Sequence, residues 1–285
     1  MKPIIKYRGG KSKEIPLLLP YIPQYTGRYI EPFLGGGAMY FHLEPERAII
    51  NDINTKLIEF YIGVQQHYTE LSQELALLEK IYNANRSKYE TLKKLHPNDK
   101  VVDKNEDLYY TLRNMYNGLT KPKFSPAALY YFINKTAYSG MIRYNARGEY
   151  NVPYGRYKNF NTALITEQHH CLLSNTEIHN SDYREIFALA TPEDFVFLDP
   201  PYDCTFSDYG NDEYKDGFDE TNHRQLANDF YNLNCKAMMV IGATPLTREL
   251  YGNSIIAEYN KNYSVNIRNR FQAEAVHIII TNYKS

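Results

Sequence analysis

The sequence predicts an α/β protein built on a mostly parallel sheet, with a helical segment inserted into the alternation of strands and helices. Three observations support this prediction. The apolar run 194–198 ends at two consecutive prolines and is typical of a buried parallel strand. Residues 28–41 contain a glycine-rich turn, Gly35–Gly37, between a short strand and a helix that begins near Ala38. The stretch 55–136 is mostly helical in its apolar spacing and separates two early strands from the later ones.

The composition is that of a globular chain: 285 residues, 43% of them hydrophobic, with a formal net charge of −1. No apolar run approaches the ~18 residues of a membrane span, and no signal peptide is expected. The three cysteines lie far apart and match neither a zinc site nor a disulfide framework, so we expect no metal and a reducing, cytoplasmic location. A net charge near zero still allows nucleic acid to bind a local basic patch.

A nucleoside pocket is predicted where the first two strands end. The turn Gly35–Gly37 contains Gly-x-Gly, but Tyr40 stands in place of the third glycine of a dinucleotide fingerprint. A cofactor without phosphates is therefore favoured over a pyrophosphate. The second strand, 48–52, ends at Asp52, whose carboxylate can accept both hydroxyls of a ribose. Asp52 can also cap the helix that follows.

The alternation of strands and helices resumes after the inserted segment. Asp182 follows a predicted strand, where it can accept an adenine amine of the cofactor or cap the next helix. Residues 206–217 are polar and predict a loop that becomes ordered over substrate. The expected elements are helices near 107–116, 127–136, 163–170, 184–189 and 220–233, and strands at 176–180, 194–198, 237–241, 254–259 and 276–282.

The tetrapeptide Asp199-Pro200-Pro201-Tyr202 is the candidate catalytic motif. Its prolines end the preceding strand, and loops past the carboxyl ends of parallel strands form the ligand crevice of an open α/β sheet. Asp199 and the Pro200 carbonyl can accept two N–H bonds from an exocyclic amine, and Tyr202 can stack on a planar base. For the tetrapeptide alone, a strand-ending turn with a surface tyrosine is the alternative.

The inserted segment ends in a basic, tyrosine-rich stretch, residues 135–158. Five basic residues and one acid, Glu149, give it a local charge of +4, and residues 145–148 predict a hairpin turn. Arginine can read guanine, lysine and arginine can hold phosphate, and tyrosine can stack on or wedge between bases. A solvated hairpin is the alternative. The basic residues are Lys135, Arg143, Arg147, Arg156 and Lys158.

Taken together, these segments resemble the Dam-like (D12 class, alpha group) adenine-N6 DNA methyltransferases, in the same order and over nearly the whole chain. Residues 6–11 are similar to the family's N-terminal cofactor-side motif, and residues 31–37 to its glycine-rich motif. Asn51-Asp52 resembles the ribose-binding acid, Asp182-Tyr183 stands where the family binds the adenine of the cofactor, and residues 199–202 match the catalytic motif.

The recognition hairpin of this family is matched by residues 140–145 and 148–158. Ser139 stands where the family often has Asn, and residues 203–217 need not follow the GATC-methylating members, so the target sequence stays open, with GATC the leading expectation. The resemblance implies DNA binding by Arg8, Tyr138, Ser139, Met141, Arg143, Asn145, Pro153, Arg156, Tyr157 and Lys158.

The resemblance also implies a Rossmann-like class I methyltransferase sheet from residues 1–60 and 161–285, with a mainly helical DNA-recognition domain at 61–160. S-adenosylmethionine is the implied cofactor and double-stranded DNA the implied partner. The implied catalytic residues are Asp199, Pro200, Pro201 and Tyr202. The implied cofactor-binding residues are Tyr7, Lys11, Glu31, Pro32, Phe33, Gly35, Gly37, Asp52, Asp182, Tyr183 and Asp199.

The expected reaction moves a methyl group to N6 of an adenine flipped out of a short duplex sequence, by in-line attack. Rival targets are cytosine N4, an RNA base or a protein amide. A DNA-binding protein with a vestigial cofactor pocket and a nicotinamide oxidoreductase are further alternatives. The sequence leaves open whether the protein has a cognate restriction endonuclease as a partner. We expect a monomer or weak dimer on DNA, associated with a prokaryotic nucleoid or a phage, and no membrane.

Overall fold

The computed structural model describes residues 1–284 except 8, 203–217 and 262–274. Its seven strands form one sheet in the order β3-β2-β1-β4-β5-β7-β6. Strands β1 to β5 pair in parallel, and β7 runs antiparallel to both β5 and β6. This is the mostly parallel, Rossmann-like sheet that the sequence and its family resemblance predict, and it ends in an antiparallel C-terminal pair. The strands are β1 (Tyr29–Glu31), β2 (Ala48–Asn51), β3 (Thr176–His179), β4 (Phe195–Leu198), β5 (Lys236–Gly242), β6 (Ile255–Lys261) and β7 (Ala275–Thr281).

Helices cover both faces of the sheet because successive strand side chains point to opposite sides. In β4, Phe195 and Phe197 pack with α1, α2 and α3, whereas Val196 and Leu198 pack with α8, α9 and α10. The helices are α1 (Ile15–Leu18), α2 (Ala38–Leu43), α3 (Thr55–Gln66), α4 (Tyr68–Leu95), α5 (Lys104–Tyr116), α6 (Pro126–Thr136), α7 (Glu167–Ser174), α8 (Tyr183–Phe187), α9 (Glu220–Tyr231) and α10 (Pro245–Tyr251).

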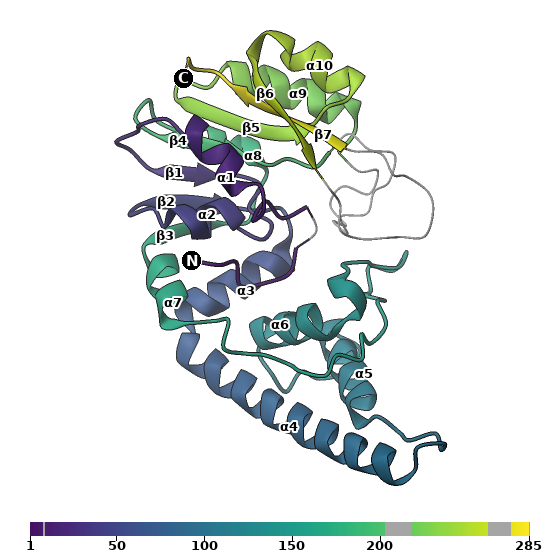
Figure 1. Ribbon diagram of the computed structural model, residues 1–285. Coiled ribbons are helices and arrows are strands. Elements are labelled where there is room, and N and C mark those ends of the chain that lie inside the picture. The colour runs from purple at the N-terminus through teal and green to yellow at the C-terminus, as the bar shows by residue number, and fades with distance from the viewer. Residues whose placement is uncertain (8, 203–217, 262–274, 285) are drawn as a thin grey trace.

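The helical segment between β2 and β3 extends away from the sheet, with α4 along its outer side (Figure 1). Its core is continuous with the core under the sheet, since Phe60 of α3 stacks on Tyr130 of α6 at 5.4 Å between ring centroids. The expected boundary at 60/61 falls inside α3, and the division into two domains stays a prediction. No helix in the described part of the chain is long and apolar enough to cross a membrane.

Two local differences from the sequence-based expectation have simple causes. The helical pattern 55–94 is broken at His67, which leaves the α-helical region and ends α3. Helix α10 was not predicted, although Thr244 and Pro245 are a helix-starting pair. There the Thr244 side chain accepts a hydrogen bond from the Thr247 amide, and Pro245 occupies the first turn. A helix of only two turns has too little periodicity to be recognised.

A buried ion pair fastens β4 to β1 at the end of the sheet opposite the carboxyl edge. The Asp194 carboxylate accepts hydrogen bonds from the Arg28 amide at 2.6 Å and the Arg28 guanidinium at 2.8 Å, and a third from the Thr191 amide at 2.8 Å. Burial would raise the pKa of Asp194, but these donors lower it from 3.8 to about 2.

We expect Asp194→Asn to reduce the free energy of unfolding by about 2–3 kcal/mol at neutral pH, because the charge is lost and one acceptor oxygen becomes an NH2 group that faces a buried donor. The pKa of Asp194 is depressed by folding, so its stabilisation is present above its ordinary pKa and is lost as pH falls through about 4 toward 2. Urea unfolding at pH 7 and at pH 2.5 measures this. An equal difference between wild type and variant at both pH values would contradict the assignment.

Candidate active site

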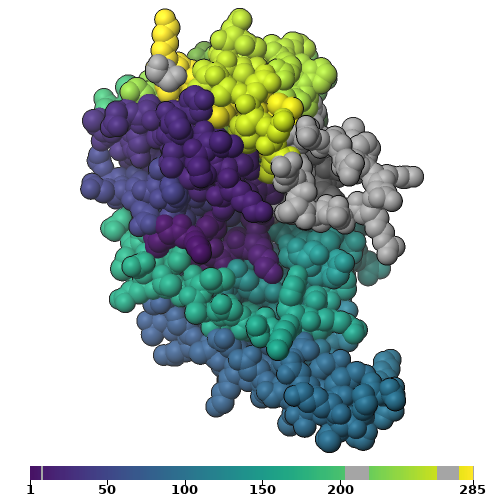
Figure 2. Space-filling view, in the orientation of Figure 1, coloured from purple at the N-terminus to yellow at the C-terminus, as the bar shows by residue number. Residues whose placement is uncertain are grey.

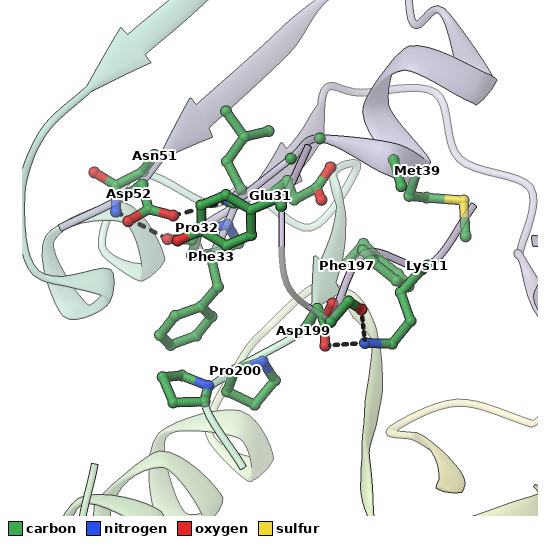
Figure 3. A pocket seen from close by; sticks show the side chains of 18 of the residues that line it. Lys11, Glu31, Pro32, Phe33, Met39, Asn51, Asp52, Phe197, Asp199 and Pro200 are labelled. Atoms are coloured by element: carbon green, nitrogen blue, oxygen red, sulfur yellow. Dashed lines mark hydrogen bonds and ion pairs between the residues drawn. The ribbon is translucent and has the colours of Figure 1, made fainter. Parts of the chain in front are cut away.

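One pocket lies at the carboxyl ends of β1, β2 and β4, where polar side chains from distant parts of the sequence meet (Figure 3). The edge of an open parallel sheet is the usual ligand position. Among the described residues that line it, three are acidic (Glu31, Asp52, Asp199) and one is basic (Lys11). The lining is Tyr7, Gly9–Lys11, Glu31–Met39, Asn51–Ile53, Ser181, Tyr183, Phe197 and Asp199–Tyr202.

The glycine turn is shaped by a tyrosine ring and a carboxylate. Gly35 has φ +49° and Gly37 has φ +63°, a left-handed conformation that favours glycine. A β-carbon at Gly35 would lie 2.8 Å from the Tyr7 ring, so the ring rests directly on the turn. The Gly35 amide donates to Asp52 at 2.8 Å, and Tyr61 donates to the Gly35 carbonyl at 3.1 Å. The turn is therefore fixed before any ligand binds.

Asp52 shapes this loop, while the neighbouring Asn54 caps the helix. The Asn54 side chain accepts from the Leu57 amide at 3.1 Å at the start of α3, whereas Asp52 accepts the Gly35 and Asn54 amides through its two oxygens. Asp52 is buried and lines the pocket. A carboxylate has about four acceptor positions, so it can accept more than two hydrogen bonds.

Glu31 is a buried carboxyl at the end of β1. Burial raises its pKa to about 8, although hydrogen bonds from the Tyr29 hydroxyl at 2.6 Å and the Tyr40 amide at 3.2 Å act in the opposite direction. Both donors bind the same oxygen, Oε2. Glu31 is thus mostly protonated at neutral pH, and a cationic group brought into the pocket would favour its ionised form.

Aromatic rings and prolines form an apolar wall of the pocket. The Phe33 and Tyr183 rings lie 5.4 Å apart with a 34° angle between their planes, and Pro200 and Pro201 are in the same lining. Asp182 instead caps α8 through the Arg184 amide at 2.9 Å and pairs with the Arg184 side chain at 2.8 Å. It is absent from the lining, so of its two predicted roles the structure shows the cap.

The candidate catalytic motif is held by a buried ammonium group. Lys11, which is 2% exposed, donates to Asp199 Oδ1 at 2.5 Å, to the Tyr202 hydroxyl at 2.6 Å and to the Gly9 carbonyl at 3.3 Å. Every hydrogen bond that described residues give Asp199 goes to Oδ1. Its Oδ2 therefore keeps its acceptor positions for a ligand. Burial lowers the pKa of Lys11, and the negative charge of Asp199 opposes this shift.

The predicted hairpin is present after α6, at the C-terminal end of the helical segment. Tyr144 and Tyr150 form an antiparallel bridge, and the Asn145 amide donates to the Glu149 carbonyl at 2.9 Å. The Asn145 side chain closes the turn by accepting the Arg147 and Glu149 amides. Asn145 thus has a structural role here, and its contact with DNA stays a prediction.

The predicted DNA-contacting residues differ in solvent exposure and in the contacts that they make within the protein. Arg143 is exposed, and its Nε donates a hydrogen bond to Asn151 Oδ1 at 2.8 Å. Tyr138 is 56% exposed.

Arg156 pairs with Glu106 at 3.2 Å, and its φ of +54° is unusual for a non-glycine residue. Ser139 shares this left-handed conformation (φ +54°), and Tyr157 lies beneath the Lys6 ammonium at 4.4 Å. Met141 is partly buried, Pro153 and Lys158 are exposed, and Arg8 lies outside the described residues.

Comparison with known proteins identifies the family. The family model of D12 class N6 adenine-specific DNA methyltransferases matches residues 7–266. The chain belongs to this family. Type II methyltransferase M.CviBI of Paramecium bursaria Chlorella virus NC1A is 35% identical, over 99% of this chain and 100% of the viral protein. Type II methyltransferase M1.LlaDCHI of Lactococcus lactis subsp. cremoris is 28% identical over 99% and 96%. DNA adenine methylase of Salmonella typhi is 30% identical over 87% and 83%.

The enzyme is therefore an adenine-specific DNA methyltransferase, as the resemblance implies. Its pocket also includes residues that are not among the implied cofactor-binding residues, although one of them, Asn51, belongs to the Asn51-Asp52 motif. Asn51 donates to the Pro32 and Ser181 carbonyls at 2.9 Å and accepts the Ser181 amide, which ties the end of β2 to its neighbours. The position of Asn51 beside Asp52 was a usable signal. Met39, Ser181 and Phe197 carried none, because small or apolar residues enter a pocket only through the tertiary fold.

We expect Gly35→Ala to weaken binding of S-adenosylmethionine, the cofactor predicted from the sequence, at least about tenfold. The left-handed conformation costs an L-residue roughly 1–2 kcal/mol, and the new methyl group meets the Tyr7 ring. Gly118→Ala is the matched control, because Gly118 has φ +71° but nothing within 4 Å of its added carbon. Isothermal titration of both variants measures the effect. Unchanged affinity in Gly35→Ala would show that the turn does not contact the cofactor.

Proposed function

We propose that this methyltransferase moves a methyl group from S-adenosylmethionine to N6 of an adenine flipped out of a short duplex DNA sequence. Asp199 and the Pro200 carbonyl hold the amine, and Tyr202 stacks on the base. The observation that supports this most directly is the Asp199 carboxylate, anchored on Lys11 through one oxygen and open to a ligand through the other. The motif stands at the carboxyl edge of the sheet, beside the glycine turn.

The pocket suits a nucleoside cofactor without phosphates. Its described lining has three acids, and its single basic side chain is already bound to Asp199, so no cation is available for a pyrophosphate. Asp52 would hold the ribose, and the Phe33–Tyr183 wall would contact the adenine of the cofactor. Glu31 would lie toward the amino-acid part, where an ammonium group favours its ionised form. When bound, S-adenosylmethionine supplies the electrophilic methyl group that the target amine attacks in line.

The target amine needs help because its lone pair is delocalised into the adenine ring. Hydrogen bonds from N6 to Asp199 Oδ2 and the Pro200 carbonyl draw the nitrogen toward a tetrahedral geometry and expose the lone pair. Asp199 also stabilises the positive charge that develops on the amine. Flipping the base out of the duplex costs a few kcal/mol, and stacking on Tyr202 offsets part of it.

The basic hairpin supports DNA as the substrate-bearing partner. Arg143 is exposed and its side chain is held in place by Asn151, which suits bidentate reading of a guanine. Tyr138 is exposed at the base of the hairpin and would wedge between bases. GATC is the first target sequence to test. A cognate restriction endonuclease accords with the Type II names of two relatives, and we propose that the enzyme acts as a monomer or weak dimer.

The test uses purified enzyme, S-adenosylmethionine and unmethylated genomic DNA, followed by methylation-sensitive long-read sequencing. We expect N6-methyladenine within one short sequence, which names the target at once. Methylated cytosine, or no transfer to DNA while the cofactor binds, would overturn the proposed substrate. A motif other than GATC would correct only the target sequence.

Replacing Asp199 by Ala should lower the single-turnover rate of methyl transfer about 10²–10³-fold or more, because a preorganised acceptor for the amine is lost. The affinity for S-adenosylmethionine should change little. Asp199→Asn keeps an acceptor for Lys11 and separates loss of charge from loss of anchoring. Asp219→Ala, which removes a helix cap at α9, serves as a control for the loss of an acid. Near-normal turnover in both Asp199 variants would refute the role of this residue.

Arg143→Ala should relax specificity at one base pair of the target by about 1–3 kcal/mol. The ratio of kcat/KM for the target and for single-base variants of it measures this. Arg147→Ala is the matched control, since Arg147 carries the same charge on the same hairpin and is also exposed. If Arg143→Ala weakened all sequences equally, Arg143 would be a phosphate contact.

A further inference from the structure

A second cluster of charged side chains lies behind the catalytic motif. The Glu14 carboxylate pairs with Lys261 at 2.7 Å, accepts the Tyr259 hydroxyl at 2.5 Å and lies 3.1 Å from His277 Nδ1. Glu14 is 6% exposed and His277 is fully buried. A carboxylate so far from water requires partners of this kind. None of these four residues lines the pocket or belongs to a motif used so far.

The cluster joins the two ends of the chain. Glu14 immediately precedes α1, Tyr259 and Lys261 belong to β6, and His277 belongs to β7. The Glu14 amide donates to the Lys11 carbonyl at 2.7 Å, so Glu14 and Lys11 share one helical turn. The C-terminal antiparallel strands are thereby fixed to the segment that supplies the ammonium group of the active site.

The cluster reaches the catalytic motif by two routes. The first is electrostatic: burial lowers the pKa of Lys11, and the charges of Asp199 and Glu14 oppose this while Lys261 adds to it. The second is steric: the His277 ring packs edge-on against the Tyr202 ring, with centroids 5.1 Å apart and planes at 83°. Burial would raise the pKa of Glu14, but hydrogen bonds from His277 and the charge of Lys11 bring it to about 2. Glu14 is therefore ionised at neutral pH.

We propose that Glu14 and His277 are positioning residues for methyl transfer. Glu14 fixes the helical turn from which Lys11 reaches Asp199, and His277, held by Glu14, fixes the plane of the Tyr202 ring against which the flipped base stacks. This inference rests on the proposed roles of Asp199 and Tyr202. It adds that their geometry is set by a cluster outside the pocket lining, to which the segment before α1, β6 and β7 contribute.

The decisive experiment compares Glu14→Gln with Asp194→Asn in single-turnover methylation of the target found by sequencing. Both changes remove one buried carboxylate whose pKa is about 2, but Asp194 lies at the opposite end of the sheet. We expect at least a tenfold lower rate in Glu14→Gln, with dissociation constants for cofactor and DNA within threefold of wild type. Asp194→Asn should lower the melting temperature but keep the rate within threefold.

A pH profile distinguishes positioning from general loosening of the fold. The ammonium of Lys11 contacts Asp199 and the Tyr202 hydroxyl, and the charges of Glu14, Lys261 and Glu31 interact with it electrostatically. Without the negative charge of Glu14, Lys11 loses its proton at lower pH. The alkaline limb of the rate profile should therefore move to lower pH in Glu14→Gln and stay in place in Asp194→Asn.

Two milder variants keep the proposal testable if Glu14→Gln does not fold. His277→Asn retains a donor for Glu14 but removes the ring beside Tyr202, and Tyr259→Phe removes one hydrogen bond to Glu14 without removing a ring. We expect both variants to methylate more slowly than wild type, with the greater loss of rate in His277→Asn. The affinity for the cofactor should be unchanged in both.

Rates within threefold of wild type in Glu14→Gln, or in both milder variants, would overturn the inference. So would an equal loss of rate in Asp194→Asn. If the wild-type enzyme itself methylated no adenine, the proposed function would fail first and this inference with it.

Discussion

The buried ion pair between Lys11 and Asp199 is the constraint on which the site depends. These residues are 188 positions apart in sequence, yet their charged atoms are 2.5 Å apart. An ammonium group with 2% exposure is stable only if acceptors replace its water, and Asp199, Tyr202 and the Gly9 carbonyl do so. The requirement draws the N-terminal segment onto the carboxyl edge of the sheet. It also occupies Oδ1 of Asp199, the carboxylate proposed to be catalytic, and leaves Oδ2 for a ligand.

The N-terminal segment connects the cofactor pocket with the recognition hairpin. The Asn134 side chain of α6 accepts the Lys6 amide at 2.9 Å and donates to the Lys6 carbonyl at 2.7 Å. The Lys6 ammonium lies over the Tyr157 ring, and the next residue, Tyr7, rests on the glycine turn. In Figure 2 this purple segment lies between the sheet and the helical segment. The proposed cofactor pocket and the proposed DNA-reading hairpin thus share one short piece of backbone, which leaves little freedom to move one without the other.

Most of the fold followed from local patterns. The apolar run before Asp199, the glycine turn and the acid after β2 are strong signals because each reflects a backbone requirement: a buried strand, a left-handed turn, a strand end. Weaker signals failed for physical reasons. Helix α10 has only two turns, and the break at His67 depends on how α3 and α4 pack. The residue type of Asn145 allowed a DNA contact or a turn, and that of Asp182 allowed a cofactor contact or a helix cap. The sequence alone could not choose between these roles.

The sequence by itself determined the fold class, the positions of the glycine turn and of the tetrapeptide 199–202, and the family, since these depend on residues close together in the chain. Only the tertiary structure decided which partners these residues have. Lys11 was expected at the cofactor and is bound to Asp199, while Glu14, Tyr259, Lys261 and His277 gave no signal at all. The reason is that buried charges are paired through space. A lysine in an N-terminal motif and a histidine in the last strand acquire their roles only when folding removes water from both.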